Sequence, residues 1–326
     1  MKALAGALAL LALATLPLWI ANGYYVNVAS QVLIWAILAL GLNVLVGYAG
    51  LVSLGHAGLF GVAAYAGAWL VAGGWSHLGA ALLAFGVIVL TSAIFAVLAL
   101  RATGISFLMI TLAIGQILWG IAYRWISFTG GDNGINVASR PAPFGWSLDP
   151  STHFYYFTLV VFLIALGAIA VFVASPLGAS LKGTRDQPRR MTALGFNVWL
   201  IRFIAVVFSG FWSGIAGVLF CYYNQFVSPS VLALGSSAEA LLMVISGGTG
   251  TLLGPVAGAA LVVVMKNVAS AYIERWNFVL GAIFVAIVLF MPEGLVPGSA
   301  RLWRQGRALL RGKGAASPLR AGRGAP

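Results

Sequence analysis

Long apolar stretches separated by short polar connections dominate this sequence. Stretches of roughly 20 apolar residues suit helices that cross a bilayer, whereas the strands of a membrane barrel would alternate at about ten residues. We therefore predict an all-α integral membrane protein, a polytopic helical bundle of about ten segments (eight to ten). The expected segments are 3–21, 28–47, 55–73, 78–100, 104–127, 153–173, 200–222, 236–247, 252–272 and 276–291.

Some of these segments differ from ordinary membrane anchors. The stretch 236–247 would reach only ~18 Å as a helix, short of the ~30 Å apolar core, so it either extends back toward Val231 or forms a re-entrant half-helix. The apolar stretch from Gly47 to Gly73 carries seven glycines besides Ser53 and His56. Glycine allows close helix packing or unwinding, and unwound backbone at membrane depth must be buried in protein or line a cavity. This stretch therefore predicts part of a transport path.

The composition supports the membrane assignment. Hydrophobic residues make up 61% of the chain and charged residues 7%, with a mean hydropathy of +1.01. A soluble chain would carry about a quarter charged residues. The net charge of +12 is thus no evidence for a nucleic-acid partner. The single cysteine, Cys221, excludes an internal disulfide, and we expect no metal site. We interpret 3–21 as a membrane helix rather than a secretory signal.

Lysines and arginines are divided unevenly between the two sides of the predicted bundle. With a cytoplasmic N-terminus and ten crossings, 13 fall on the inner side and three (Arg124, Arg140 and Arg275) on the outer side. Positive residues favour the cytoplasmic side, so both termini are predicted to be cytoplasmic. We expect a transmembrane domain over 1–292 and a basic cytoplasmic tail over 293–326. In the tail, 299–313 either forms an interfacial helix on membrane lipid or only sets the topology.

The longest inner connection, about 175–199, mixes apolar, basic and acidic residues. Arg185 and Asp186 are expected to open a short helix, and Gly195 suits a helix C-terminal cap. Such a surface favours docking of another protein over a solvated connector. The candidate docking residues are Arg185, Asp186, Arg189, Arg190, Leu194 and Gly195.

The largest outer connection, about 128–152, contains a glycine-rich turn. Gly131, Asp132 and Asn133 are typical of a tight turn, and a soluble partner on the outer side would meet them. The same residues offer too few oxygen ligands for a calcium site.

Few ionisable residues lie well inside the expected segments. His56 either makes a structural hydrogen bond, which we favour, or contacts the substrate. Glu239 either caps a helix N-terminus or pairs with Lys266, for which Glu274 is the other candidate partner. The sequence lacks a G-x-x-x-x-G-K-[ST] phosphate loop. The scarcity of embedded acidic residues disfavours a secondary transporter. The scatter of His56, His77 and His153 disfavours a membrane-embedded enzyme.

Several motifs between about Leu38 and Gly294 are informative together: Gly41 to Asn43, Gly47 to Tyr65, Arg101 to Ala113, Thr129 to Gly134, Ser175 to Gly195, Phe226 to Ser230 and Glu239 to Pro255. With this set the sequence resembles the LivM-type membrane permease subunit of ABC importers for branched-chain amino acids. The sequence departs from the family pattern at Leu177, Ala179 and Gln187.

This resemblance implies a type II importer architecture in the bacterial inner membrane, with some broken or re-entrant helices. The implied partners are a second permease subunit in a heterodimer, two cytoplasmic ATPase subunits and a periplasmic substrate-binding protein. The 175–199 loop would dock into the ATPase, which uses the ATP, while this chain binds no cofactor and catalyses no reaction. The implied cargo is leucine, isoleucine, valine or a related apolar amino acid. Urea and short-chain amides are the alternative.

Polar residues within the apolar segments are our candidates for the pathway or its gates: Asn43, Ser53, Gly55, His56, Thr111, Gln116 and Glu239. A weak internal echo accompanies them, because a set of small residues recurs at an offset of 200: Gly47, Gly50, Ala57 and Gly58 match Gly247, Gly250, Ala257 and Gly258. In a transporter such an echo is expected from a duplicated half.

Overall fold

Helices form most of the described chain. The computed structural model describes residues 15, 17, 22–137, 139–142, 146–272, 276–291 and 294–299. Each segment expected from residue 28 onward corresponds to a helix, so the prediction of a helical bundle is confirmed. Apart from single positions, the expected segment 3–21 and the expected interfacial helix 299–313 lie outside the described residues, as does Glu274.

The apolar helices fall into two length classes. Within the described ranges, five helical stretches are long and apolar enough to cross a membrane, and His56–Ala72, Leu234–Gly247 and Gly254–Ser270 are shorter. The bounds are α2 (Gly23–Asn43) continued by the π-helix η1 (Val44–Ala49), α3 (His56–Ala72), α4 (His77–Ala99), α5 (Ile105–Arg124), α7 (Ser151–Ala174), α10 (Val198–Asn224), α11 (Leu234–Gly247), α12 (Gly254–Tyr272) and α13 (Trp276–Phe290).

Local sequence explains where several helices begin. Ser76 accepts a hydrogen bond from the Gly79 N–H at the start of α4, and Asn197 accepts one from the Leu200 N–H at the start of α10. These side chains satisfy backbone donors that have no partner within the helix. Ser175 does the same ahead of Pro176, at the start of α8 (Pro176–Asp186). Proline is favoured there because its missing N–H costs nothing in the first turn.

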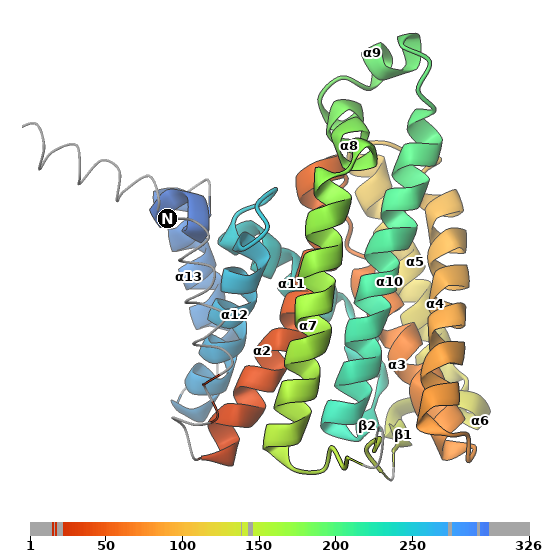
Figure 1. Ribbon diagram of the computed structural model, residues 1–326, viewed down its shortest axis with the longest axis vertical. Coiled ribbons are helices and arrows are strands. Elements are labelled where there is room, and N and C mark those ends of the chain that lie inside the picture. The colour runs from red at the N-terminus through yellow and green to blue at the C-terminus, as the bar shows by residue number, and fades with distance from the viewer. Residues whose placement is uncertain are drawn as a thin grey trace, which may run out of the picture.

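The α2 helix lies at the centre of the bundle, whereas α4, α5 and α7 expose most of their surface (Figure 1). From Leu33 onward every described α2 residue is buried, and α2 packs against α7, α10, α11 and α12. A helix that is apolar all round is expected in such a position.

Two groups of short elements mark opposite ends of the bundle (Figure 1). The end bearing α8 and α9 (Pro188–Ala193) is called the inner end, following the orientation predicted from charge. The outer end carries α6 (Ile126–Thr129), the 3-10 helices η2 (Gly131–Asn133) and η4 (Pro229–Leu232), and strands β1 (Ile135–Asn136) and β2 (Phe226–Val227). The two strands pair antiparallel, with Ile135 opposite Val227.

Two local predictions were wrong. Arg185 and Asp186 do not open a helix; they end α8, because Pro176 starts this helix a full ten residues earlier and Pro188 starts the next. Glu239 does not cap a helix N-terminus, because α11 begins at Leu234 and has no acidic residue in its first turn. The expected cap at Gly195 is confirmed: this residue follows α9 with φ +85°, and the Phe196 N–H donates to Met191 O at 3.1 Å.

Candidate functional site

The π-helix η1 leads into a non-helical break at the inner end of the bundle. Gly50 adopts the left-handed conformation (φ +68°), and no helix resumes until His56. Ser53 and Gly55 in this break are buried. The glycine-rich stretch singled out in the sequence thus contains irregular backbone enclosed by protein, which is the condition for such backbone at membrane depth.

Asn43 joins this break to the turn between α11 and α12. Its side chain is fully buried, its Nδ2 donates to Thr251 O at 2.9 Å, and its Oδ1 accepts from the Gly250 N–H at 3.0 Å. Gly47 lies directly against Gly250, so that a Cβ at Gly47 would collide with the Gly250 backbone. Gly250 is itself left-handed (φ +73°). The two glycine turns that echo each other in sequence are therefore in contact.

His56 belongs to a buried chain of hydrogen bonds. Its Nδ1 lies 2.9 Å from Ser53 Oγ and its Nε2 2.9 Å from Ser209 Oγ. Ser209 Oγ donates its hydrogen to Gly41 O at 2.6 Å, so it accepts from His56 Nε2, and Ser53 must donate to Nδ1. Both ring nitrogens of a neutral imidazole are thereby satisfied. The geometry matches the structural hydrogen bonding that we favoured from sequence.

Thr111 meets the same cluster from α5. Its Oγ1 accepts from the Leu54 N–H at 3.2 Å and donates to Leu108 O at 2.8 Å. A Cβ at Gly55 would collide with Thr111 O, so this glycine permits α5 to approach the break. Gln116 lies further along α5 and is half-buried. The structure thus gathers Ser53, Gly55, His56 and Thr111 in one place.

Glu239 takes part in a separate polar group on α11 and α12. Its two carboxylate oxygens accept from Lys266 Nζ at 3.0 and 3.1 Å, which confirms one of the two predicted pairings of Lys266. The Glu239 side chain is 18% exposed and that of Lys266 38%. Next to Lys266, the Asn267 Nδ2 donates to Gln31 Oε1 at 3.1 Å and connects α12 to α2.

Sequence reasoning did not select Ser209 or Ser237. The Ser237 Oγ accepts from the Ala57 N–H at 3.1 Å, which fixes the first turn of α3 against α11. A serine in an apolar helix often only bonds its own backbone, as Ser213 does to Ser209 O. Spacing alone therefore gives no signal that separates the two kinds of serine.

Three cationic side chains attach α8 to the bundle. The Arg185 Nη1 donates to Gly47 O at 2.6 Å, and the Arg202 Nη2 of α10 donates to Thr184 O at 2.7 Å. Lys182 places its Nζ 5.4 Å from the centre of the Tyr48 ring, within range of a cation–π interaction. This helix is therefore fixed to η1 on one side and to α10 on the other.

The α9 helix, by contrast, projects from the inner end (Figure 1). It has no buried residue, and Arg189 and Arg190 are exposed. Leu194, just beyond it, is 65% exposed, and Phe196 nearby is exposed as well. Asp186 is exposed as well and accepts from Arg185 Nε at 2.8 Å. Four of the six predicted docking residues thus lie on α9 and its cap, and the other two end α8. Asp186 is at the surface, whereas Arg185, although 42% exposed, directs its Nη1 to Gly47 O.

The outer turn lies on a small closed platform. Asp132 and Asn133 are exposed, whereas Gly131 is buried against Ile126 and Tyr123. Arg140 fastens the following loop to α10, because its Nε and Nη2 donate to Tyr222 O (3.1 Å) and Tyr223 O (3.0 Å). Its Nη1 donates to Asp149 O at 3.0 Å.

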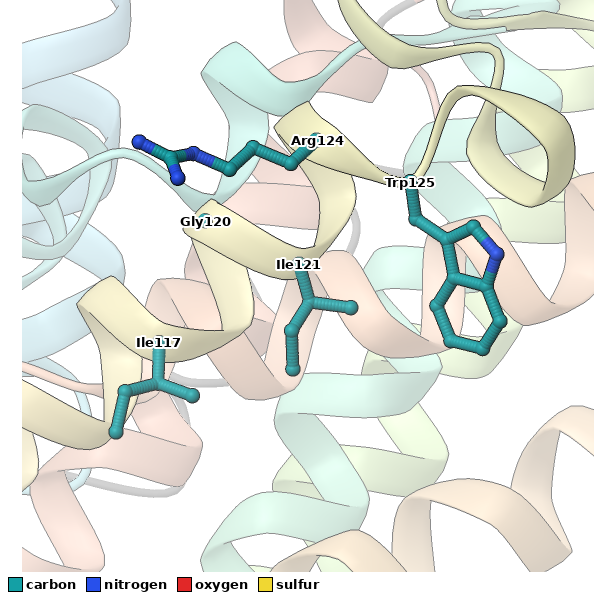
Figure 2. Close-up of a pocket in the computed structure, with 5 residues that line it drawn as sticks. All are labelled: Ile117, Gly120, Ile121, Arg124 and Trp125. Carbon is teal, nitrogen blue, oxygen red and sulfur yellow. The ribbon is translucent and has the colours of Figure 1, made fainter.

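An open hollow of about 560 Å³ lies on the outer half of α5. Figure 2 shows its lining, Ile117, Gly120, Ile121, Arg124 and Trp125, all from α5 and the residue after it. Arg124 and Trp125 extend in different directions, and the two isoleucines form the apolar floor. Since one helix supplies every wall, the hollow is the surface of an exposed helix rather than an enclosed ligand site.

A helical membrane protein with a broken central helix and two short helices projecting at one end is the class that these features define. Residues 24–288 match the family model described as the permease component of branched-chain amino acid transport systems, and the chain belongs to this family.

Individual relatives agree with this family. The high-affinity branched-chain amino acid transport system permease protein LivM of Escherichia coli K12 is 31% identical over 83% of this chain and 70% of its own length. The corresponding LivH protein of the same organism is 22% identical over 42% of this chain and 45% of its own length. A solved metal-chelate type ABC transporter in an inward-facing conformation is 18% identical, with a TM-score of 0.45, over 82% of this chain and 87% of that one.

Proposed function

We propose that this chain is the permease subunit of an ATP-binding cassette importer that carries branched-chain amino acids into the cytoplasm. The observation that carries the proposal is the inner platform, in which exposed α9 is joined through the firmly held α8 to the broken end of the central helix. A protein docked on α9 would act on the break directly. Membership in the permease family supports leucine, isoleucine and valine as cargo.

In this mechanism an ATPase dimer binds the α9 surface formed by Arg189, Arg190 and Leu194. ATP binding and hydrolysis move the platform, and the glycine-packed helices pass that movement to the gates of the path. The path opens alternately to the two sides of the inner membrane. The permease itself performs no chemistry on the cargo and holds no nucleotide.

The polar side chains near the break suit a path that does not bind its cargo tightly. Asn43, His56 and Thr111 each direct their hydrogen bonds to other groups of the protein. A zwitterionic amino acid would find little here to replace its hydration shell. Selection of the cargo therefore belongs to a periplasmic binding protein, which docks on the outer platform around Gly131, Asp132 and Asn133.

The remaining partner is a second permease subunit. The relation of this chain to both LivM and LivH supports a heterodimer of two related permeases. Its lateral contact would cover helices that are mostly exposed in the single chain, among them α5. With both termini on the cytoplasmic side, α8 and α9 face the ATPases.

The test is uptake of radiolabelled leucine by proteoliposomes that contain the whole complex. ATP is enclosed in the lumen, which takes the place of the cytoplasm. We expect uptake that requires ATP, the binding protein and an ATPase able to hydrolyse ATP. Uptake that persists with a hydrolysis-deficient ATPase would contradict an importer and favour a secondary transporter. Competition by unlabelled urea or acetamide, but not by valine, would move the cargo to the urea and amide class.

A further inference from the structure

We infer that Arg185 is a positioning residue that transmits movement of the docking helix α8 to the two glycine turns, and is not part of the surface that binds the ATPase. The inference rests on the proposed function, because it specifies how the docked ATPase would reach the gates.

The first observation is the direction of the Arg185 side chain. Its Nη1 donates to Gly47 O at 2.6 Å, while its Nε donates to the neighbouring Asp186 at 2.8 Å. A carbonyl in the last turn of a helix lacks an intrahelical partner, so a guanidinium can bind it and also interact well with the negative end of the helix dipole. Asp186 holds the guanidinium in position from its solvent-exposed side. Arg185 therefore binds the last turn of the central helix through a hydrogen bond to a backbone carbonyl.

The second observation is the close packing of the Arg185 side chain on Gly50. The aliphatic stem of Arg185 lies over Gly50, where an added Cβ would stand 2.5 Å from Arg185 Cγ. Gly50 also needs its left-handed backbone, which residues with a side chain rarely adopt. Both features require glycine at this position, where η1 ends and the break begins. The α8 helix contacts the chain there.

The third observation is that Gly47, whose carbonyl accepts from Arg185, also contacts the second glycine turn at Gly250. Gly47 packs on Gly250, and Asn43, one helical turn earlier, bonds the backbone of Gly250 and Thr251. Thr251 Oγ1 in turn accepts from the Gly254 N–H at 3.1 Å, at the start of α12. A shift of Arg185 would therefore act on the inner end of the central helix and, through Gly47, on the turn between α11 and α12.

The other attachments of α8 do not have this property. Arg202 bonds Thr184 from α10 and does not reach either glycine turn. Lys182 lies over the ring of Tyr48 in η1, but it makes no hydrogen bond to the backbone there. The α9 helix leaves Arg189, Arg190 and Leu194 for the ATPase. This division separates docking from transmission along the same loop.

The experiment compares Arg185→Gln with Arg185→Lys and with Arg101→Gln, an equal change of charge at an exposed residue of another inner connection. For each purified complex we would measure the retained ATPase subunits, the rate of ATP hydrolysis and the leucine transported per ATP. We expect Arg185→Gln to keep its ATPase subunits and to lose at least tenfold in leucine per ATP. Arg185→Lys should recover part of this ratio, and Arg101→Gln should match wild type.

A second variant keeps the inference testable from the other side of the contact. Gly50→Ala displaces the Arg185 stem without changing any charge, and we expect the same loss of coupling. Combined with Arg185→Gln it should add little, because both changes break one contact.

Loss of the ATPase subunits from the Arg185→Gln complex would overturn the inference and return Arg185 to the docking surface. An unchanged ratio of leucine transported per ATP in both Arg185→Gln and Gly50→Ala would also overturn the inference. ATP-independent uptake by the wild-type complex is a different result: it would refute the proposed importer itself.

Discussion

One amide side chain supplies the hydrogen bonds between the two glycine turns, which also pack directly through Gly47 and Gly250. Asn43→Ala deletes the donor to Thr251 O and the acceptor for the Gly250 N–H. Asn43 is fully buried, and the alanine cannot replace either hydrogen bond. We therefore expect the two turns to lose their hydrogen-bonded connection, while the packing of Gly47 on Gly250 and of the helices on either side remains.

The expected cost follows from the groups left behind. Each buried backbone group without a partner costs about 1–3 kcal/mol, so two such groups cost about 2–6 kcal/mol. Gly250 and Thr251 are only partly buried, so water can satisfy them in part. The free energy of unfolding should then fall by about 2–4 kcal/mol, the lower part of that range.

The assay is equilibrium unfolding of the purified permease in mixed micelles, followed by helical circular dichroism. Ser30→Ala provides a matched control, because Ser30 lies on the same helix, is equally buried, and donates only to Val26 O at 3.0 Å. That carbonyl keeps its helical hydrogen bond, so the control should cost less than about 1 kcal/mol. An Asn43→Ala protein no less stable than Ser30→Ala would refute the role of this bridge.

Three further substitutions test other parts of the structure. His56→Phe removes both imidazole hydrogen bonds, so that the Ser53 hydroxyl loses its acceptor while Ser209 keeps its bond to Gly41 O. The free energy of unfolding should fall by about 1–3 kcal/mol in the same assay, and an unchanged value would contradict the hydrogen-bond chain. Arg140→Lys loses the forked donors to the end of α10, so amide hydrogen exchange should accelerate there and not at the inner end. Leu194→Glu should reduce ATPase co-purification at least tenfold without changing unfolding; normal co-purification would exclude this surface.

Most of the fold could be predicted because membrane burial imposes long apolar runs. The expected 55–73 and 78–100 correspond to His56–Ala72 and His77–Ala99 within a residue at each end. The π-helix η1 could not be predicted, since Val44 to Ala49 has the composition of any apolar helix. Its geometry accompanies contacts with Gly250 and Arg185 that come from segments far along the chain. Tertiary contacts of this kind leave no local signal.

The candidate site was predictable in its members more than in their arrangement. Polar residues in apolar segments are conspicuous, so Asn43, His56 and Thr111 were selected, and the structure places each of them beside the break or its connections. Arg185 was expected to belong to the docking surface because its loop mixes apolar, basic and acidic residues. Nothing in the sequence reveals that a backbone carbonyl 138 positions away accepts its hydrogen bond.

Close backbone contact at the inner end also limits how these turns can move. Gly47 and Gly250 touch without side chains between them, and each turn is fixed by a left-handed glycine and by the amide of Asn43. Packed contacts of this type tend to switch between discrete arrangements rather than deform gradually. If α8 moves in the proposed mechanism, its bond from Arg185 to Gly47 would need only a small displacement to separate the two turns. In the proposed importer, the glycines of the central break would serve the movement that they permit rather than contact with the cargo.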